Sequence, residues 1–213
     1  MNIGLILSSG EGRRFNSSIP KQYCLLNEKE VIEYSIKAMK ESTELDAFIV
    51  TCNHCYIEPL QKKYGVICIE GGATRNESLY KGLAYIRENF VDCRKVFIQE
   101  AARPFVTAAI ISQYIQLLDK YDAVITTKKI TDSLGGTDEW IVDREQYFLV
   151  QAPEAFDFGK LYESFKPDSP ITATYQQLPV GSKVYCNYDF ENNLKITYSN
   201  DLKLAELMMK GFD

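Results

Sequence analysis

Histidine is almost absent from this chain, which has 213 residues and a single histidine, His54. A mechanism built on a histidine base therefore has one candidate, and its neighbours in sequence offer no support for that role. No apolar run of about 18 residues occurs, so no segment is expected to span a membrane. Acidic residues outnumber basic ones to give a net charge of −5, which argues against nonspecific binding to nucleic acid.

Matched cysteine pairs are also missing. The six cysteines are spaced irregularly, and the segment from Cys52 to Cys55 resembles only half of a zinc site. We favour the interpretation that these two cysteines lie at the end of a strand by chance. A metal-binding or redox role is the alternative. The first apolar strand begins at Ile3, which leaves no room for a signal peptide. We therefore expect reduced thiols and a cytoplasmic protein, organised as one domain over residues 1–213.

The chain does contain a regular alternation of apolar strands and amphipathic helices. Strands are expected at 3–7, 47–51, 66–69, 96–99, 123–127 and 183–186, and helices at 31–39, 78–90, 108–119 and 201–209. This order predicts an α/β fold with a Rossmann-like, mostly parallel sheet and helices on both faces. Residues 128–152 break the alternation, which predicts a protruding β-arm. An apolar arm needs a surface to pack on, and a second subunit is the natural partner.

The loop after the first strand combines glycines with cations. Glycines let the backbone bend and approach a ligand, and the N–H groups of such a turn point toward anions. The loop therefore predicts a polyphosphate site, and an ordinary solvated basic loop is the alternative. Phe15 stands where a dinucleotide fingerprint has its third glycine, and Lys21-Gln22 does not fit a Walker loop. The residues in question are Ser9, Gly10, Gly12, Arg13, Arg14 and Lys21.

Further polar segments follow three other expected strands. Parallel α/β sheets bind ligands at the carboxyl ends of their strands, so we expect four strand ends to converge on one crevice. The three segments are Gly71-Gly72-Ala73-Thr74-Arg75, Glu100-Ala101-Ala102-Arg103-Pro104 and Asp132-Ser133.

Taken together, seven segments resemble the cytidylyltransferases that activate polyol phosphates such as methylerythritol phosphate or ribitol phosphate. Each segment alone is a weak signal, but all seven occur in order and cover nearly the whole chain. They are Gly10-Glu11-Gly12-Arg13-Arg14-Phe15, Pro20-Lys21-Gln22-Tyr23, Gly71 to Ser78, Ala101-Ala102-Arg103-Pro104-Phe105, Val142-Asp143-Arg144, Ala152-Pro153-Glu154-Ala155-Phe156 and Leu194-Lys195-Ile196-Thr197.

The resemblance implies transfer of CMP from CTP to a polyol phosphate, with release of pyrophosphate. It implies that Arg14, Lys21 and Lys195 clamp phosphates, and that Arg13 either shares this task or faces solvent. Catalysis would then be mostly positioning and electrostatic stabilisation of the transferring phosphoryl group. The resemblance also implies Mg²⁺ as a cofactor, held with the help of Glu100.

The remaining implied contacts divide between the nucleotide and the acceptor. The resemblance implies that Ser78 and Arg75 contact the nucleotide. The alternative for Ser78 is that it only caps a helix, and the alternative for Arg75 is that it is an ordinary surface charge. Arg144 matches an arginine that enters the neighbouring subunit's site, which implies a homodimer, although a surface salt bridge is the alternative. The implied nucleotide contacts are Ser9, Gly10, Gly12, Arg13, Gly71, Gly72, Arg75, Ser78 and Ala101, and the implied acceptor contacts are Arg103, Asp132, Ser133 and Arg144.

Several positions depart from the family pattern. Glu100 replaces an aspartate, Glu154 replaces a glutamine, and Thr172-Ala173-Thr174 replaces a threonine followed by two acidic residues. The change at Glu100 bears on the metal, whereas the changes at 152–154 and 172–174, with Ser8-Ser9 in place of Ala-Ala in the first loop, lie in or near the substrate half. These latter changes lead us to favour a ribitol-phosphate-like substrate, with methylerythritol phosphate as the alternative. The residues are also compatible with a uridylyl- or guanylyltransferase and with a non-catalytic nucleotide-binding relative.

Overall fold

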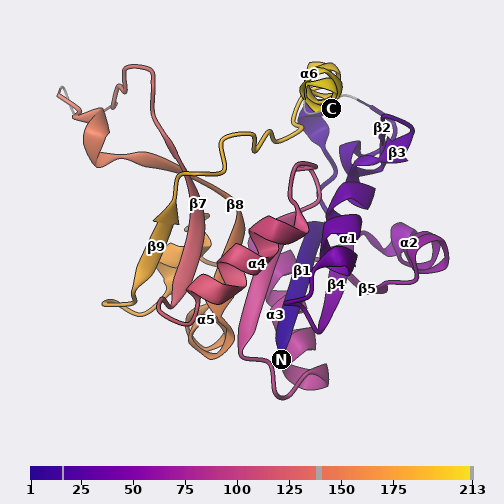
Figure 1. Cartoon of the computed structure of the whole chain (residues 1–213), viewed down its shortest axis with the longest axis horizontal. Coiled ribbons are helices and arrows are strands. Elements are labelled where there is room, and N and C mark those ends of the chain that lie inside the picture. Colours follow the sequence, from indigo (N-terminus) through magenta and orange to yellow (C-terminus); the bar gives the residue numbers. More distant parts are fainter. Residues whose placement is uncertain (16, 138–140, 212–213) are drawn as a thin grey trace.

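The computed structural model describes residues 1–15, 17–137 and 141–211, apart from the side chain of Arg13. Its centre is a seven-stranded sheet of described residues with the strand order β5-β4-β1-β6-β8-β7-β9 (Figure 1). These strands are β1 (Asn2–Ser8), β4 (Ala47–Cys52), β5 (Ile67–Glu70), β6 (Lys95–Glu100), β7 (Ala123–Lys129), β8 (Phe148–Asp157) and β9 (Val184–Asn187). A short hairpin of β2 (Leu25–Leu26) and β3 (Lys29–Glu30) lies apart from this sheet.

Helices cover both faces of the sheet and bury its alternating apolar side chains. On one face Ile6, Val50 and Phe97 pack against α1, α2 and α4; on the other Leu5 and Ile98 pack against α3 and α5. The predicted α/β architecture, with its mostly parallel Rossmann-like sheet, is confirmed. The helices are α1 (Val31–Glu41), α2 (Ile57–Tyr64), α3 (Arg75–Asn89), α4 (Ala108–Leu117), α5 (Phe158–Ser164) and α6 (Asn200–Lys210).

The start of α3 differs from the prediction for a local reason. The apolar spacing places the start at Ser78, but the Thr74 side chain accepts a hydrogen bond from the Glu77 backbone N–H at 3.1 Å. This N-cap satisfies one of the unpaired N–H groups of the first turn, so the helix begins at Arg75. The earlier start matters because it places Arg75 in the first turn of the helix, beside the end of β6.

The sheet is parallel through β5, β4, β1 and β6, and then changes direction. Strand β8 lies between β6 and β7 and is antiparallel to both. The sequence pattern predicts residues 148–152 as part of the arm and no strand over 153–157, whereas the strand continues to Asp157. Pro153 and Glu154 interrupt the apolar run, so the sequence shows no continuous strand pattern here. The segment is nevertheless a strand, because it pairs with β6 on one side and β7 on the other.

The predicted arm corresponds to the connection between β7 and β8, which projects away from the sheet (Figure 1). Its described part carries exposed apolar side chains, namely Leu134, Ile141 (85% exposed) and Tyr147. The extended segment expected at Trp140 lies outside the described residues.

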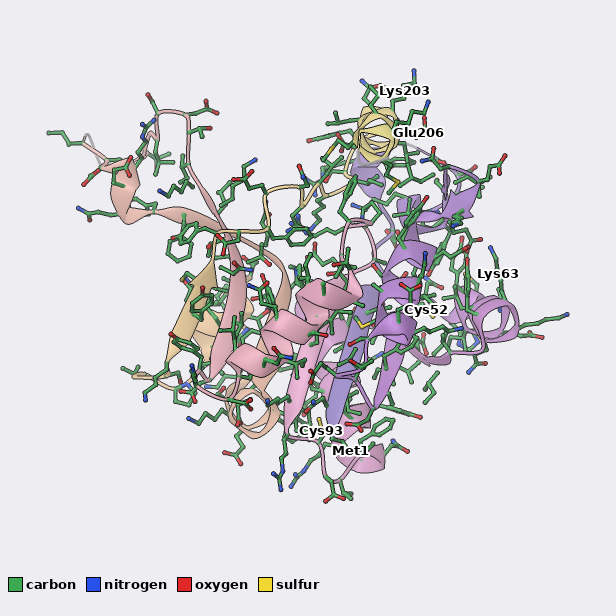
Figure 2. The ribbon with its side chains drawn as sticks, viewed as in Figure 1. Met1, Cys52, Lys63, Cys93, Lys203 and Glu206 are labelled. Atoms are coloured by element: carbon green, nitrogen blue, oxygen red, sulfur yellow. The ribbon has the colours of Figure 1, made fainter. Side chains whose placement is uncertain are left out.

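All six cysteines are free thiols. Cys52 lies toward the carboxyl end of β4, whereas Cys93 lies near Met1 at the opposite end of the sheet (Figure 2). Within the described ranges, no helix is both long and apolar enough to cross a membrane.

Candidate active site

A cavity of about 200 Å³ opens at the carboxyl ends of β1 and β6, beside the start of α3. It continues into a larger hollow through Ser9, Gly10, Gly72 and Ala73, which line both. Most of the predicted nucleotide and catalytic residues are therefore brought together. The predicted residues that line the cavity are Ser9, Gly10, Lys21, Gly72, Arg75, Ser78, Glu100, Ala101 and Lys195, and the neighbouring hollow adds Gly12 and Gly71.

The basic loop is shaped mainly by Gly12 and Gln22. Gly12 has a φ of +67°, a conformation that favours glycine, whereas Gly10 does not need one. The buried Gln22 amide donates to the carbonyls of Ser8 and Gly10 at 2.7 and 2.9 Å, which holds the loop over the end of β1. Sequence reasoning assigned no role to Gln22, because a single glutamine in a polar loop carries no pattern that distinguishes it from surface.

The glycines after β5 are required by packing against protein atoms. A Cβ on Gly71 would lie 1.8 Å from the Ser9 Oγ, and one on Gly72 would lie 2.2 Å from the Glu77 Cβ. The Ser78 hydroxyl accepts from the Gly72 N–H at 3.0 Å and fixes the turn. The two glycines thus let the first loop and the start of α3 meet closely at the cavity wall.

Glu100 lies at the centre of the charged cluster. Its Oε2 accepts from Lys195 Nζ at 2.7 Å and Arg103 Nε at 3.3 Å, and its Oε1 accepts from Arg75 Nε at 3.3 Å. Burial alone would raise the pKa of this carboxyl, but the three cations outweigh burial and lower the pKa to about 2. Glu100 is therefore ionised near neutral pH and holds cations from three parts of the chain together.

The predicted clamp cations do share one region. Burial, followed by the charge of Lys195, lowers the pKa of Lys21 to about 8, and Arg14 and Arg103 act in the same direction. Arg14 is exposed in the short 3₁₀ helix Arg13–Phe15, yet its charge is close enough to affect Lys21. Like charges repel at such range, so the region favours a polyanion that would relieve the repulsion.

Arg75 is fully engaged with protein acceptors. Besides Glu100, it donates from Nη2 to Glu154 Oε2 at 2.9 Å and from Nη1 to the Thr174 hydroxyl at 3.1 Å. Glu154 and Thr174 are buried, and burial raises the pKa of Glu154 while Arg75 opposes this shift. Sequence reasoning noted Glu154 only as a departure and missed this contact, since 79 residues separate Arg75 from Glu154.

The three predicted acceptor residues on the arm lie elsewhere. Asp132 and Ser133 are exposed after β7, and Arg144 donates to the Thr131 carbonyl at 2.6 Å within the arm. The expectation that four strand ends converge is therefore wrong within one chain: the ends of β1, β5 and β6 meet, and the segment after β7 projects away. Arg103 is the acceptor candidate that does reach the cluster, where its Nη1 donates to the Asn193 carbonyl at 2.8 Å.

One polar atom in the cavity wall is left without a partner in the described structure. The Ser9 Oγ is buried and makes no hydrogen bond. Buried polar groups are nearly always satisfied in folded proteins, but this oxygen is packed against Gly71 with almost no accessible surface, so it does not by itself mark a ligand contact.

A sheet of this topology, with a glycine-bracketed loop after β1 and a cationic cavity at the strand ends, defines an α/β nucleotidyltransferase fold. The model of the family described as "IspD: 2-C-methyl-D-erythritol 4-phosphate cytidylyltransferase" matches residues 3–211. The chain belongs to this family and is a cytidylyltransferase, which confirms the resemblance seen in the sequence.

Curated relatives and solved structures agree with this assignment. Two relatives are named 2-C-methyl-D-erythritol 4-phosphate cytidylyltransferase. The one from Lachnospira eligens is 30% identical in sequence, over 99% of this chain and 100% of the relative. The one from Neorickettsia sennetsu is 31% identical, over 97% of this chain and 96% of the relative. The bifunctional IspDF from Campylobacter jejuni superposes with a TM-score of 0.81 at 27% identity, over 95% of this chain and 53% of that longer chain. The structure of the Thermus thermophilus 2-C-methyl-D-erythritol 4-phosphate cytidylyltransferase, which is 22% identical, shows the same fold. It superposes with a TM-score of 0.79 over 99% of this chain and 100% of that chain.

The lowered pKa of Lys21 predicts that CTP binding weakens in mild alkali. The free ammonium loses its proton as the pH rises through about 8, whereas the bound triphosphate favours the charged form. We expect the Kd for CTP to rise about tenfold between pH 7 and 9, as measured by titration calorimetry. Lys21→Arg, which stays charged, is the matched control and should show a flat profile; an equally steep profile in that variant would contradict the assignment.

Proposed function

We propose that this cytidylyltransferase transfers CMP from CTP to 2-C-methyl-D-erythritol 4-phosphate and releases pyrophosphate. The observation that carries the proposal is the family match over residues 3–211, together with relatives of that name aligned over nearly their full length. The sequence pattern favoured a ribitol-phosphate-like acceptor, whereas these matches support methylerythritol phosphate. Two of the departures behind that preference are Glu154 and Thr174. Their side chains are hydrogen-bonded to each other and to Arg75, so these contacts lie within the protein and give no reason to prefer a ribitol-phosphate-like acceptor.

The cationic cluster supplies what this reaction needs. The acceptor phosphate and CTP are both anions, so they repel each other, and charge accumulates around the α-phosphorus as one P–O bond forms and the bond to the leaving pyrophosphate breaks. Lys21, Arg14 and Lys195 would bind the triphosphate and offset this charge. Because these groups are already in place, little reorganisation accompanies the step, and each such contact is worth about a hundredfold or more in rate.

The residues in and beside the cavity suggest how the two substrates are bound. The loop of Ser9 and Gly10 and the Gly71-Gly72 turn, which line the cavity and the neighbouring hollow, would hold the nucleotide. Arg103 does not itself line the cavity, but it is buried beside Glu100 next to the lining residues Ala101 and Ala102, from where its charge would attract the acceptor phosphate. Backbone N–H groups of the first loop would add positive potential without further charged side chains.

Glu100 fits a role in holding Mg²⁺. Magnesium in such sites is bound by one or two carboxylates, with substrate phosphates and water completing its shell. Glu100 is an ionised carboxylate on the cavity wall, and the described residues contain no cluster of three carboxylate, histidine or cysteine ligands that would hold a metal alone. Bound with CTP, Mg²⁺ would neutralise phosphate charge, while Lys195 and Arg103 orient the Glu100 oxygens.

An acceptor panel tests the proposed function directly. Purified protein with CTP and Mg²⁺ is assayed for pyrophosphate release with the phosphates of methylerythritol, ribitol, arabinitol, erythritol and glycerol. We expect the highest kcat/KM with methylerythritol phosphate, by at least about tenfold, since a buried polar site discriminates strongly against an acceptor that leaves its groups unpaired. A higher kcat/KM with ribitol phosphate would overturn the acceptor assignment, and UTP, GTP and ATP serve as nucleotide controls.

Removal of divalent metal should abolish turnover. Addition of a chelator is expected to stop pyrophosphate release, and excess Mg²⁺ is expected to restore it, because the Glu100 carboxylate and the triphosphate together form the binding site. Turnover that persists after exhaustive chelation would remove the metal role given to Glu100.

We further propose that the active unit is a homodimer in which the arm of one subunit completes the site of the other. The arm carries exposed apolar residues, and Asp132, Ser133 and Arg144 lie on it, away from the cavity of their own chain. Mixing Arg14→Ala with Arg144→Ala protein, after subunit exchange, is expected to restore up to about a quarter of wild-type activity, because one site in a mixed dimer is intact. Activity no higher than that of either variant alone would indicate self-contained subunits.

A further inference from the structure

We infer that Glu154 is a positioning residue of this site: it anchors Arg75, and through Arg75 it holds the Glu100 carboxylate at the edge of the phosphate cavity. The inference extends the proposed role of Glu100 in binding CTP with Mg²⁺. It does not depend on which polyol phosphate is the acceptor.

Glu154 lies in the interior of the sheet on β8, with its side chain 2% exposed. Its Oε2 accepts from Arg75 Nη2 at 2.9 Å and from the Thr174 hydroxyl at 3.0 Å. That hydroxyl in turn accepts from Arg75 Nη1 at 3.1 Å. The guanidinium is therefore held along one edge by a carboxylate and by a hydroxyl that the same carboxylate orients.

The charge of Glu154 is explained by Arg75. A buried carboxylate is costly unless a cation and hydrogen bonds compensate it, and its other oxygen, Oε1, has no hydrogen-bond partner in the described structure. Arg75 is the cation that contacts Glu154 directly. Burial and the negative charge of Glu100 act in the opposite direction and raise the pKa of Glu154. Burial lowers the pKa of Arg103, and the charges of Glu100 and Glu154 counteract this shift. A carboxylate in this setting fixes one orientation of a planar guanidinium better than a neutral amide would.

Arg75 transmits this anchoring to Glu100. Its Nε donates to Glu100 Oε1, whereas Lys195 and Arg103 bind Oε2. Each oxygen of Glu100 is thus held from a different side, and Arg75 is the side-chain partner found on Oε1 in the described part of the chain. If Arg75 lost its hold on Glu154, the guanidinium, which itself lines the cavity, would keep only Glu100 and its longer bonds to Thr174 and the Thr172 carbonyl, and Glu100 Oε1 would be oriented less firmly.

A double-mutant cycle tests this chain of contacts. Glu154→Gln removes the charge and keeps the shape, and we expect it to weaken CTP binding in the presence of Mg²⁺ about tenfold. Arg75→Gln is expected to weaken binding at least as much, because it also leaves Glu154 buried without its cation. The double variant should bind CTP no more weakly than Arg75→Gln alone, since Glu154 acts through a side chain that is already gone.

The controls separate positioning from a general loss of structure. Glu163→Gln makes the same chemical change at an exposed position on α5 and should leave CTP affinity unchanged. Thermal unfolding of every variant is recorded alongside the calorimetry. Thr174→Val, which removes only the shared hydroxyl, is expected to weaken CTP binding two- to threefold; should Glu154→Gln fail to fold, this variant decides the matter.

Two outcomes would overturn the inference. One is wild-type CTP affinity in folded Glu154→Gln, or in Thr174→Val if the first variant does not fold. The other is additive losses in the double variant, which would mean that Glu154 and Arg75 act separately. Because the cycle measures CTP binding without an acceptor, it stands apart from the acceptor panel: a different preferred polyol phosphate would change the proposed function and leave this result intact.

Discussion

The structure depends on a concentration of like charges that the carboxylate of Glu100 draws together. Arg75, Arg103 and Lys195 come from three separate parts of the chain and all contact Glu100, with Lys21 nearby. Without Glu100 these cations would repel one another in a partly buried region, where water screens them weakly. With it, the cluster keeps an excess of positive charge and a defined geometry, which is the electrostatic requirement for bringing two phosphorylated anions together.

The backbone around this cluster is adapted to the same end. Gln22 ties the first loop to the end of β1, and Gly71 and Gly72 allow that loop and the start of α3 to meet closely. The cavity walls therefore come from elements that the buried sheet fixes, and the loops between them have little freedom to spread. Preorganisation of this kind suits a reaction in which the protein supplies position and charge and needs no nucleophile of its own.

The arm raises a different structural question, which is why a chain with a well-packed sheet exposes Ile141 and Tyr147 on a projecting connection. Exposed apolar side chains on an extended segment gain little by themselves and become favourable when another surface covers them. The predicted acceptor residues of this segment, Asp132, Ser133 and Arg144, lie away from the cavity of their own chain. A shared site between subunits accounts for both features and motivates the proposed homodimer.

Local sequence patterns were enough to predict most of the elements and most members of the candidate site. Strands β1, β4, β5, β6, β7 and β9, the four expected helices and the residues after β1, β5 and β6 could be predicted because hydrophobic period, turn chemistry and motif order are local properties. Strand β8 was cut short, because Pro153 and Glu154 break the local pattern and only the neighbouring strands make that segment extended. Helices α2 and α5 and the β2–β3 hairpin were not predicted, because elements of two to eight residues are too short to show a clear apolar period. Long-range packing is what places Glu154 and Thr174 on Arg75 and carries the arm residues away from their own site. Such contacts join positions up to 99 residues apart, and no local pattern of side chains encodes which distant partner satisfies a buried charge.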